Sequence, residues 1–251
     1  PPGQVFTLKP IQVFPSLHHR LNSKVTLFAT TSSKSYFVTA NADVSSHILH
    51  NLSTTLHPII KTPILRLLSS PIPPTIAPSL CLATAELVGG NRILALNAAC
   101  ALHLIHVVAH THTTIINHQH LTEFSLGTEL LTRDELLALV YEMVAGTPSD
   151  DAETATRLLK VLMEVATTAT AVAFVDVKQR EGKLAVCAAV CGAILGGGNE
   201  EEIERARRLG MFIGNIELAK AEVELVLGFE EVKAKAIRRL LQEMLSTHFD
   251  D

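Results

Sequence analysis

Six of the twelve histidines lie between residues 103 and 120, and imidazole is a common metal ligand. His103, His106 and His110 are spaced i, i+3, i+7, so on a helix they share one face. The spacing of His106 and His110 also suits two helix-borne metal ligands. However, the next acid is Glu123 and no HExxH pattern is present. We interpret the cluster as the polar face of a groove or interface, with a metal site or a pH-sensing role as alternatives.

Two cysteines lie four residues apart, Cys187 and Cys191, within a segment of small residues. A redox pair needs closer spacing at a helix N-terminus, so we interpret them as small buried side chains that permit close helix packing, which suits an interface. The four cysteines of the chain are too few for a disulfide scaffold, which favours a reducing compartment.

Gly196-Gly197-Gly198 resembles a phosphate loop only in composition, because neither GxGxxG nor GxxxxGK[ST] is present. Three glutamates follow directly and would repel phosphate. We interpret the glycines as a turn. No GxSxG motif indicates a serine hydrolase.

The acids are distributed very unevenly. Only Asp43 and Glu86 fall in residues 1–122, which excludes a carboxylate-rich metal site there, whereas twelve of the 25 acids fall in 200–251. The net charge of −4 gives no basic field for nucleic acid. No apolar run reaches the ~20 residues of a membrane span, so we expect neither nucleic acid nor membrane as a partner.

Helical periodicity predicts one all-α domain of about eight helices over residues 41–251. Asn91 is expected to cap one helix, and Asn199 with Glu202 to form a capping box at the start of another. The segment 183–195 is small or apolar on nearly every face, which predicts deep burial. Residues 1–40 carry basic and hydroxyl side chains and no acid, a composition typical of an organelle transit peptide or a disordered tail.

Three stretches resemble plant trans-isoprenyl diphosphate synthases of the geranylgeranyl type. They are Leu80-Cys-Leu-Ala-Thr-Ala-Glu-Leu-Val-Gly-Gly90, Ala98-Ala-Cys-Ala-Leu-His-Leu-Ile-His106 and Val190-Cys-Gly-Ala-Ile-Leu-Gly-Gly-Gly-Asn-Glu-Glu-Glu-Ile-Glu204. The resemblance implies the all-α isoprenoid synthase fold, here in a shortened form.

Active members of this family carry two Asp-rich motifs that hold Mg²⁺ on the allylic diphosphate. At the matching positions of the first motif this chain has Thr113, Thr114 and Gln119, and at those of the second it has Ala221 and Glu222. The resemblance therefore implies no catalytic residues and no bound metal in this chain.

This chain keeps the helical segments of the family but lacks its charged catalytic residues. In this combination it resembles the small subunits of plant heteromeric geranyl diphosphate synthases. That likeness implies a plastid protein, inactive alone, that binds a catalytic large subunit as a heterodimer or heterotetramer and shifts its product toward geranyl diphosphate for monoterpenes. Mg²⁺ would be held by the large subunit. Small subunits carry CxxxC motifs for association. Cys187 and Cys191 match one, and Cys81 begins the other, whose second position is Ala85.

Two other functions stay open. The chain could be a divergent, active prenyltransferase in which His and Thr replace Asp around the metal, although neutral imidazoles and hydroxyls hold Mg²⁺ poorly. It could also be a stand-alone prenyl-ligand binding or scaffold protein with no synthase partner.

Overall fold

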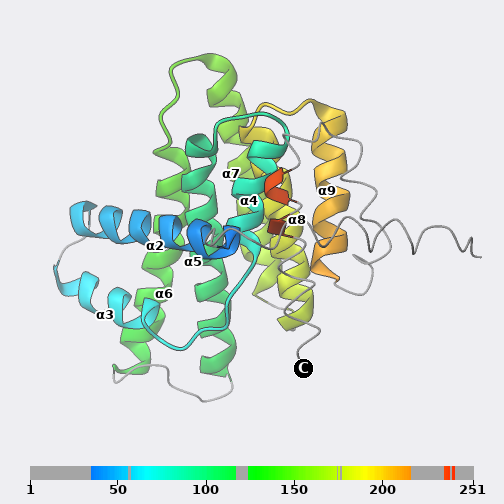
Figure 1. The fold of residues 1–251 in the computed structure, drawn as a ribbon. Helices are drawn as coiled ribbons and strands as arrows, with labels where there is room; N and C mark the ends of the chain where they lie inside the picture. The colour runs from blue at the N-terminus through cyan, green and yellow to red at the C-terminus, as the bar shows by residue number, and fades with distance from the viewer. Residues whose placement is uncertain are drawn as a thin grey trace, which may run out of the picture. The chain divides into compact units, whose positions relative to one another are not determined.

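The computed structural model describes residues 35–55, 58–116, 124–173, 175, 177–215, 235–237 and 239–240, and every regular element in these ranges is helical (Figure 1). The all-α prediction is confirmed in this part of the chain. The helices are α2 (Tyr36–Thr55), α3 (Pro58–Leu68), α4 (Ala77–Leu87), α5 (Arg92–Ile116), α6 (Leu126–Ala145), α7 (Ala152–Val172), α8 (Val177–Leu195) and α9 (Glu200–Gly214).

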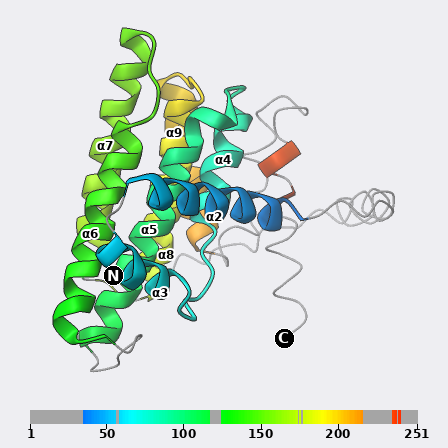
Figure 2. The same cartoon turned by 90° about the vertical axis from the view of Figure 1, so that its left-hand side faces the viewer.

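The first described helix begins earlier than the predicted start of the domain at residue 41. In α2, apolar side chains at four-residue spacing, from Ala40 to Leu52, are almost completely buried. This face packs on α4 and α5, and Figure 2 shows α2 lying across both helices. The predicted transit peptide spans residues 1–40. Its residues 1–34 lie outside the described part of the chain, and residues 36–40 belong to α2.

Helix α3 was not predicted from the sequence. Pro63 lies inside it, and proline in a helix interior removes a backbone hydrogen bond. Ile64 and Leu67 are nevertheless fully buried, and α3 packs against α6. Burial of this apolar face therefore overrides the low helix propensity of the segment.

The predicted helix caps are confirmed. The backbone N–H of Glu202 donates to Asn199 Oδ1 at 2.9 Å, and the backbone N–H of Asn199 donates to Glu202 Oε2 at 2.8 Å. The backbone N–H of Ile93 donates to Asn91 Oδ1 at 2.9 Å before α5. These bonds satisfy helix N–H groups that have no partner within the helix.

Helix α8 is the centre of the packing, in contact with α4, α5, α7 and α9 (Figure 1). As predicted for 183–195, the apolar side chains from Leu184 to Leu195 are at most 5% exposed, except Val186, which is partly exposed. A helix surrounded in this way needs apolar residues on all its faces, which explains its weak amphipathic pattern.

Helix α5 has the length and hydropathy of a membrane span between Arg92 and Thr114. Most of that stretch is buried within the protein, against α4, α6, α8 and α2. The same composition serves the core helix of a helical bundle, where neighbouring helices take the place of lipid.

Glycines bring α8 into close contact with α4 and α9, two of its four neighbours. A Cβ atom at Gly192 would lie 2.0 Å from Thr84 Oγ1 and 2.2 Å from the carbonyl oxygen of Cys81, both on α4. A Cβ atom at Gly210 on α9 would lie 2.6 Å from the Cα of Val186. The spacing of these three helices therefore depends on the missing side chains.

We expect Gly192→Ala to destabilise the protein by about 2 kcal/mol or more, because the new methyl group meets backbone that cannot move aside. Thermal unfolding should then begin roughly 4–8 °C lower than in the parent protein. The matched control is Gly127→Ala, where the atom nearest to the new methyl group, Ser125 Oγ, would be 3.9 Å away. The control should leave the melting temperature unchanged or slightly raised. Equal effects of the two substitutions would contradict the close α4–α8 contact.

Candidate functional site

The C-terminal part of α5 carries Thr113 and Thr114, which the sequence resemblance matches to the first pair of aspartates in active synthases. Thr113 Oγ1 donates to the carbonyl oxygen of Ala109 at 3.1 Å. Thr114 Oγ1 donates to the carbonyl oxygen of Thr111 at 2.8 Å. Both hydroxyl protons are therefore used within the helix itself.

A guanidinium lies against this position. Arg180, near the start of α8, is 1% exposed, and its Nη2 donates to Thr113 Oγ1. A charge at this depth is costly unless hydrogen bonds compensate for its lost hydration. The bond to Thr113 joins α5 and α8 across 67 residues of sequence and fixes a positive charge beside the motif position.

The residues present at this position do not fit Mg²⁺. The ion requires several oxygen ligands, preferably carboxylates, in octahedral geometry. Here Thr113 and Thr114 offer only hydroxyl groups already bonded to backbone, and the Arg180 cation would repel a second cation. The other predicted replacements, Gln119 in the first motif and Ala221 and Glu222 in the second, lie outside the described residues.

His106 from the histidine cluster belongs to a buried polar network. Its Nε2 lies 2.8 Å from the carbonyl oxygen of Pro73, which only accepts, so Nε2 carries a proton. Its Nδ1 lies 2.9 Å from Glu181 Oε1, within ion-pair distance but without hydrogen-bond alignment. Thr75 donates to Glu181 Oε2 at 2.7 Å. The network joins the loop before α4 to α5 and α8.

This arrangement argues against the alternative of a helix-borne metal pair at His106 and His110, because both ring nitrogens of His106 already face protein oxygens. Within the described residues, no three His, Cys, Asp or Glu side chains converge on a common point. His118 and His120 lie outside those residues.

The remaining described histidines of the cluster are held neutral. Burial and the neighbouring His106 lower the pKa of His103 to about 4. Burial lowers the pKa of His110 and His112, and the Arg180 guanidinium lowers both further. Arg133 on α6 has the same effect on His112. This end of α5 therefore has positive electrostatic potential, the opposite of a carboxylate motif.

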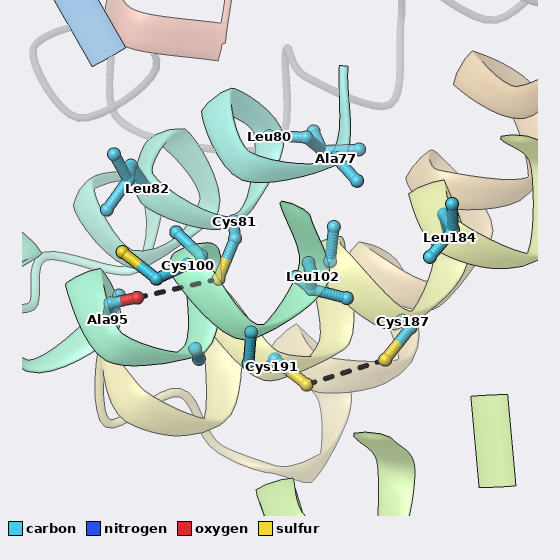
Figure 3. Packing of buried hydrophobic residues seen from close by; sticks show 14 of the residues in the cluster. Ala77, Leu80, Cys81, Leu82, Ala95, Cys100, Leu102, Leu184, Cys187 and Cys191 are labelled. Atoms are coloured by element: carbon cyan, nitrogen blue, oxygen red, sulfur yellow. Dashed lines mark hydrogen bonds between the residues drawn. The ribbon is translucent and has the colours of Figure 1, made fainter. Parts of the chain in front are cut away.

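All four cysteines are free and buried, and three come from the predicted partner-binding set (Figure 3). Cys81 on α4 and Cys187 and Cys191 on α8 are at most 1% exposed, and the two α8 sulfur atoms lie 3.7 Å apart. Burial raises the pKa of the Cys81 thiol, and the hydrogen bond with Cys187 together with burial raises the pKa of Cys191, so neither ionises readily. These side chains offer no surface to a partner, and any influence on association acts through the packing of α4 and α8.

Sequence reasoning missed Arg180, Glu181 and Arg133. The first two belong to a short polar stretch, residues 178–183, that is typical of an exposed helix start. Only the distant pairing of Arg180 with Thr113 and of Glu181 with His106 reveals their positions. In the sequence, the absence of acids from residues 103–122 was the feature that indicated that a cation could lie beside this segment.

The chain is similar to known proteins over most of its length, although no family model matches it. A heterodimeric geranylgeranyl pyrophosphate synthase small subunit from Cannabis sativa is 31% identical, with 82% of each chain covered. The geranyl diphosphate synthase small subunit from Antirrhinum majus superposes with a TM-score of 0.69 and 26% identity, over 85% of this chain and 100% of that one.

A deletion mutant of the heterotetrameric geranyl pyrophosphate synthase from mint superposes equally well. Its TM-score is 0.70 at 27% identity, over 82% of this chain and 98% of that chain. These similarities show that the chain belongs to the plant small subunits of the trans-isoprenyl diphosphate synthase family.

Proposed function

We propose that this chain is a non-catalytic regulatory subunit that binds a geranylgeranyl-type large subunit and shifts its product toward geranyl diphosphate. The relative from Cannabis sativa is named a small subunit of a heterodimeric synthase, and the mint synthase is heterotetrameric. The relative is also named chloroplastic, which supports a plastid role in supplying monoterpene precursors.

The observation that carries the proposal is the contact between Arg180 and Thr113. Departure of diphosphate needs divalent cations held by carboxylates, and this chain places a guanidinium and two bonded hydroxyls there instead. The scaffold helices persist around that position. We therefore assign the Mg²⁺ and the chemistry to the large subunit, and binding to this chain.

Control of product length requires only a modest energetic bias. A small subunit that binds one conformation of the large subunit more tightly shifts the population toward that conformation. A coupling of about 1–3 kcal/mol changes the balance between releasing geranyl diphosphate and extending it by roughly 5–150-fold. Such a bias needs a rigid contact surface but no catalytic group in this chain.

We assign the contact surface to the exposed side of α6 and α7, which pack against each other. Leu159 and Met163 lie one turn apart on α7 and are 63% and 71% exposed, and Leu131 on α6 is 72% exposed. Around them, Lys160 pairs with Glu200 at the surface. Large apolar side chains rimmed by charges are typical of protein interfaces.

The proposed function is tested by assays with isopentenyl and dimethylallyl diphosphates and Mg²⁺. The purified chain alone should form no prenyl product. Adding it to a geranylgeranyl-type synthase should raise the ratio of geranyl to geranylgeranyl diphosphate by about tenfold, within the range set by the coupling energy. Turnover by the chain alone would instead support a divergent prenyltransferase. An unchanged ratio without co-elution would support a stand-alone binding protein.

The proposed interface is tested by the double substitution Leu159→Glu and Met163→Glu. Two carboxylates at the centre of the contact should weaken the affinity for the large subunit by at least about tenfold, because they would be buried there without partners. Co-elution with the large subunit measures this loss. The matched control is Ile93→Glu at the start of α5, where the side chain is 73% exposed. Retained association of the double variant, at an unchanged melting temperature, would place the interface elsewhere.

A further inference from the structure

A hydrogen bond between His112 and Arg133 joins α5 to α6, and its direction is fixed. Arg133 Nη1 donates to His112 Nδ1, because a guanidinium has no acceptor. The Nδ1 atom therefore carries no proton, and the proton of the neutral ring is on Nε2. If Nδ1 took up a proton, two positively charged donors would face each other. The contact thus requires a neutral His112.

The charges around His112 favour the neutral ring. Burial lowers its pKa, and the guanidinium groups of Arg133 on α6 and Arg180 on α8 lower it further. Asp134 lies 3.4 Å from Arg133, but its side chain is 65% exposed, and ion pairs in such positions contribute little. Apart from Arg133 and Asp134, the lining of the cavity beside His112 has one titratable side chain, Tyr141.

The other histidines on this part of α5 have the same preference. Burial and then the neighbouring His106 lower the pKa of His103 to about 4. Burial also lowers the pKa of His110, with further contributions from His106 and Arg180. Acidification would therefore add positive charge to a helix that already lies beside two guanidinium groups.

The described carboxylates near α5 are already engaged. Glu181 on α8 lies within ion-pair distance of a histidine on α5. Glu129 is buried on α6, one turn before Arg133, and has an interaction of its own. On α2 and α4, Asp43 and Glu86 both pair with Arg92. A proton taken up by His112 would thus find little compensation.

We propose that the contact between Arg133 and His112 is an acid-sensitive switch, which holds α6 against α5 while the ring is neutral and opens when the ring is protonated. Leu131, which we assign to the surface for the large subunit, lies two residues before Arg133 on α6. Opening would therefore disturb that surface and weaken association at acid pH. This last step rests on the proposed function, whereas the switch itself belongs to the isolated chain.

The direction of the pH dependence follows from the lowered pKa of His112. Histidine in an unfolded chain titrates at about pH 6.5. Below that pH the unfolded chain takes up the proton and the folded chain resists it, so stability is lost as the pH falls. Between about pH 7.5 and about pH 5.5, a histidine that stays neutral in the fold raises the unfolding equilibrium constant by up to about tenfold.

The switch is tested by following the His112 ring by NMR while the isolated chain is titrated with acid. The midpoint should lie below about pH 6.5, the value for an unfolded chain. Arg133→Met should raise this midpoint by about one pH unit, because the guanidinium no longer opposes the proton. A midpoint at or above the unfolded value, or one that Arg133→Met leaves unchanged, would overturn the proposal.

A second variant, His112→Asn, keeps an acceptor at the position of Nδ1 but cannot be protonated. Between about pH 7.5 and about pH 5.5, its unfolding constant should rise less than that of the parent chain, by up to about tenfold. Its affinity for the large subunit should also fall less. The matched control is His50→Asn, because His50 is exposed and lies on α2.

Equal effects of the two asparagine substitutions would overturn the role of His112. Absence of association at about pH 7.5 would instead overturn the proposed function, while the NMR titration of the isolated chain would still decide the switch.

Discussion

The buried guanidinium of Arg180 joins α8 to the C-terminal part of α5 through its hydrogen bond to Thr113. Taking such a charge out of water is costly, and breaking its hydrogen bonds would leave the cost uncompensated. Its bond to Thr113 compensates part of this cost and joins α8 to α5, two helices that pack against each other. In the match to active synthases proposed above, this fixed cation lies beside the position of the first pair of aspartates.

The rest of the fold keeps α5 and α8 in the positions this contact requires. Gly192 lets α4 approach α8 closely, and Gly210 does the same for α9. Just beyond Arg180, the Glu181 carboxylate reaches His106 on α5 and Thr75 in the preceding loop. The polar contacts thus lie at one end of α8 and the small-residue contacts along its length. The packing of the bundle is therefore retained around Thr113 and Thr114, and the proposed binding role requires such a rigid scaffold.

Much of the fold could be predicted from the sequence, because its signals are local. Asn199 with Glu202, and the small apolar segment 183–195, specify a helix start and a buried helix within a few residues. Helix α3 escaped prediction since Pro63 contradicts its helical state and only packing on α6 stabilises it. For the site, the sequence predicted only that Thr113 and Thr114 stand in place of aspartates. The replacement, Arg180, is 67 residues away, and no periodic pattern reports that pairing.

We propose that Arg180 and the bonded threonines replace the metal site of active synthases, and the effect of Mg²⁺ on thermal unfolding tests this directly. The isolated chain and an active large subunit should be melted with geranyl diphosphate, once in EDTA and once in millimolar Mg²⁺. The melting temperature of the large subunit should rise with the metal, and that of this chain should be the same in both buffers. If the melting temperature of this chain were several degrees higher in Mg²⁺ than in EDTA, the chain would still bind the metal. That result would contradict the proposal.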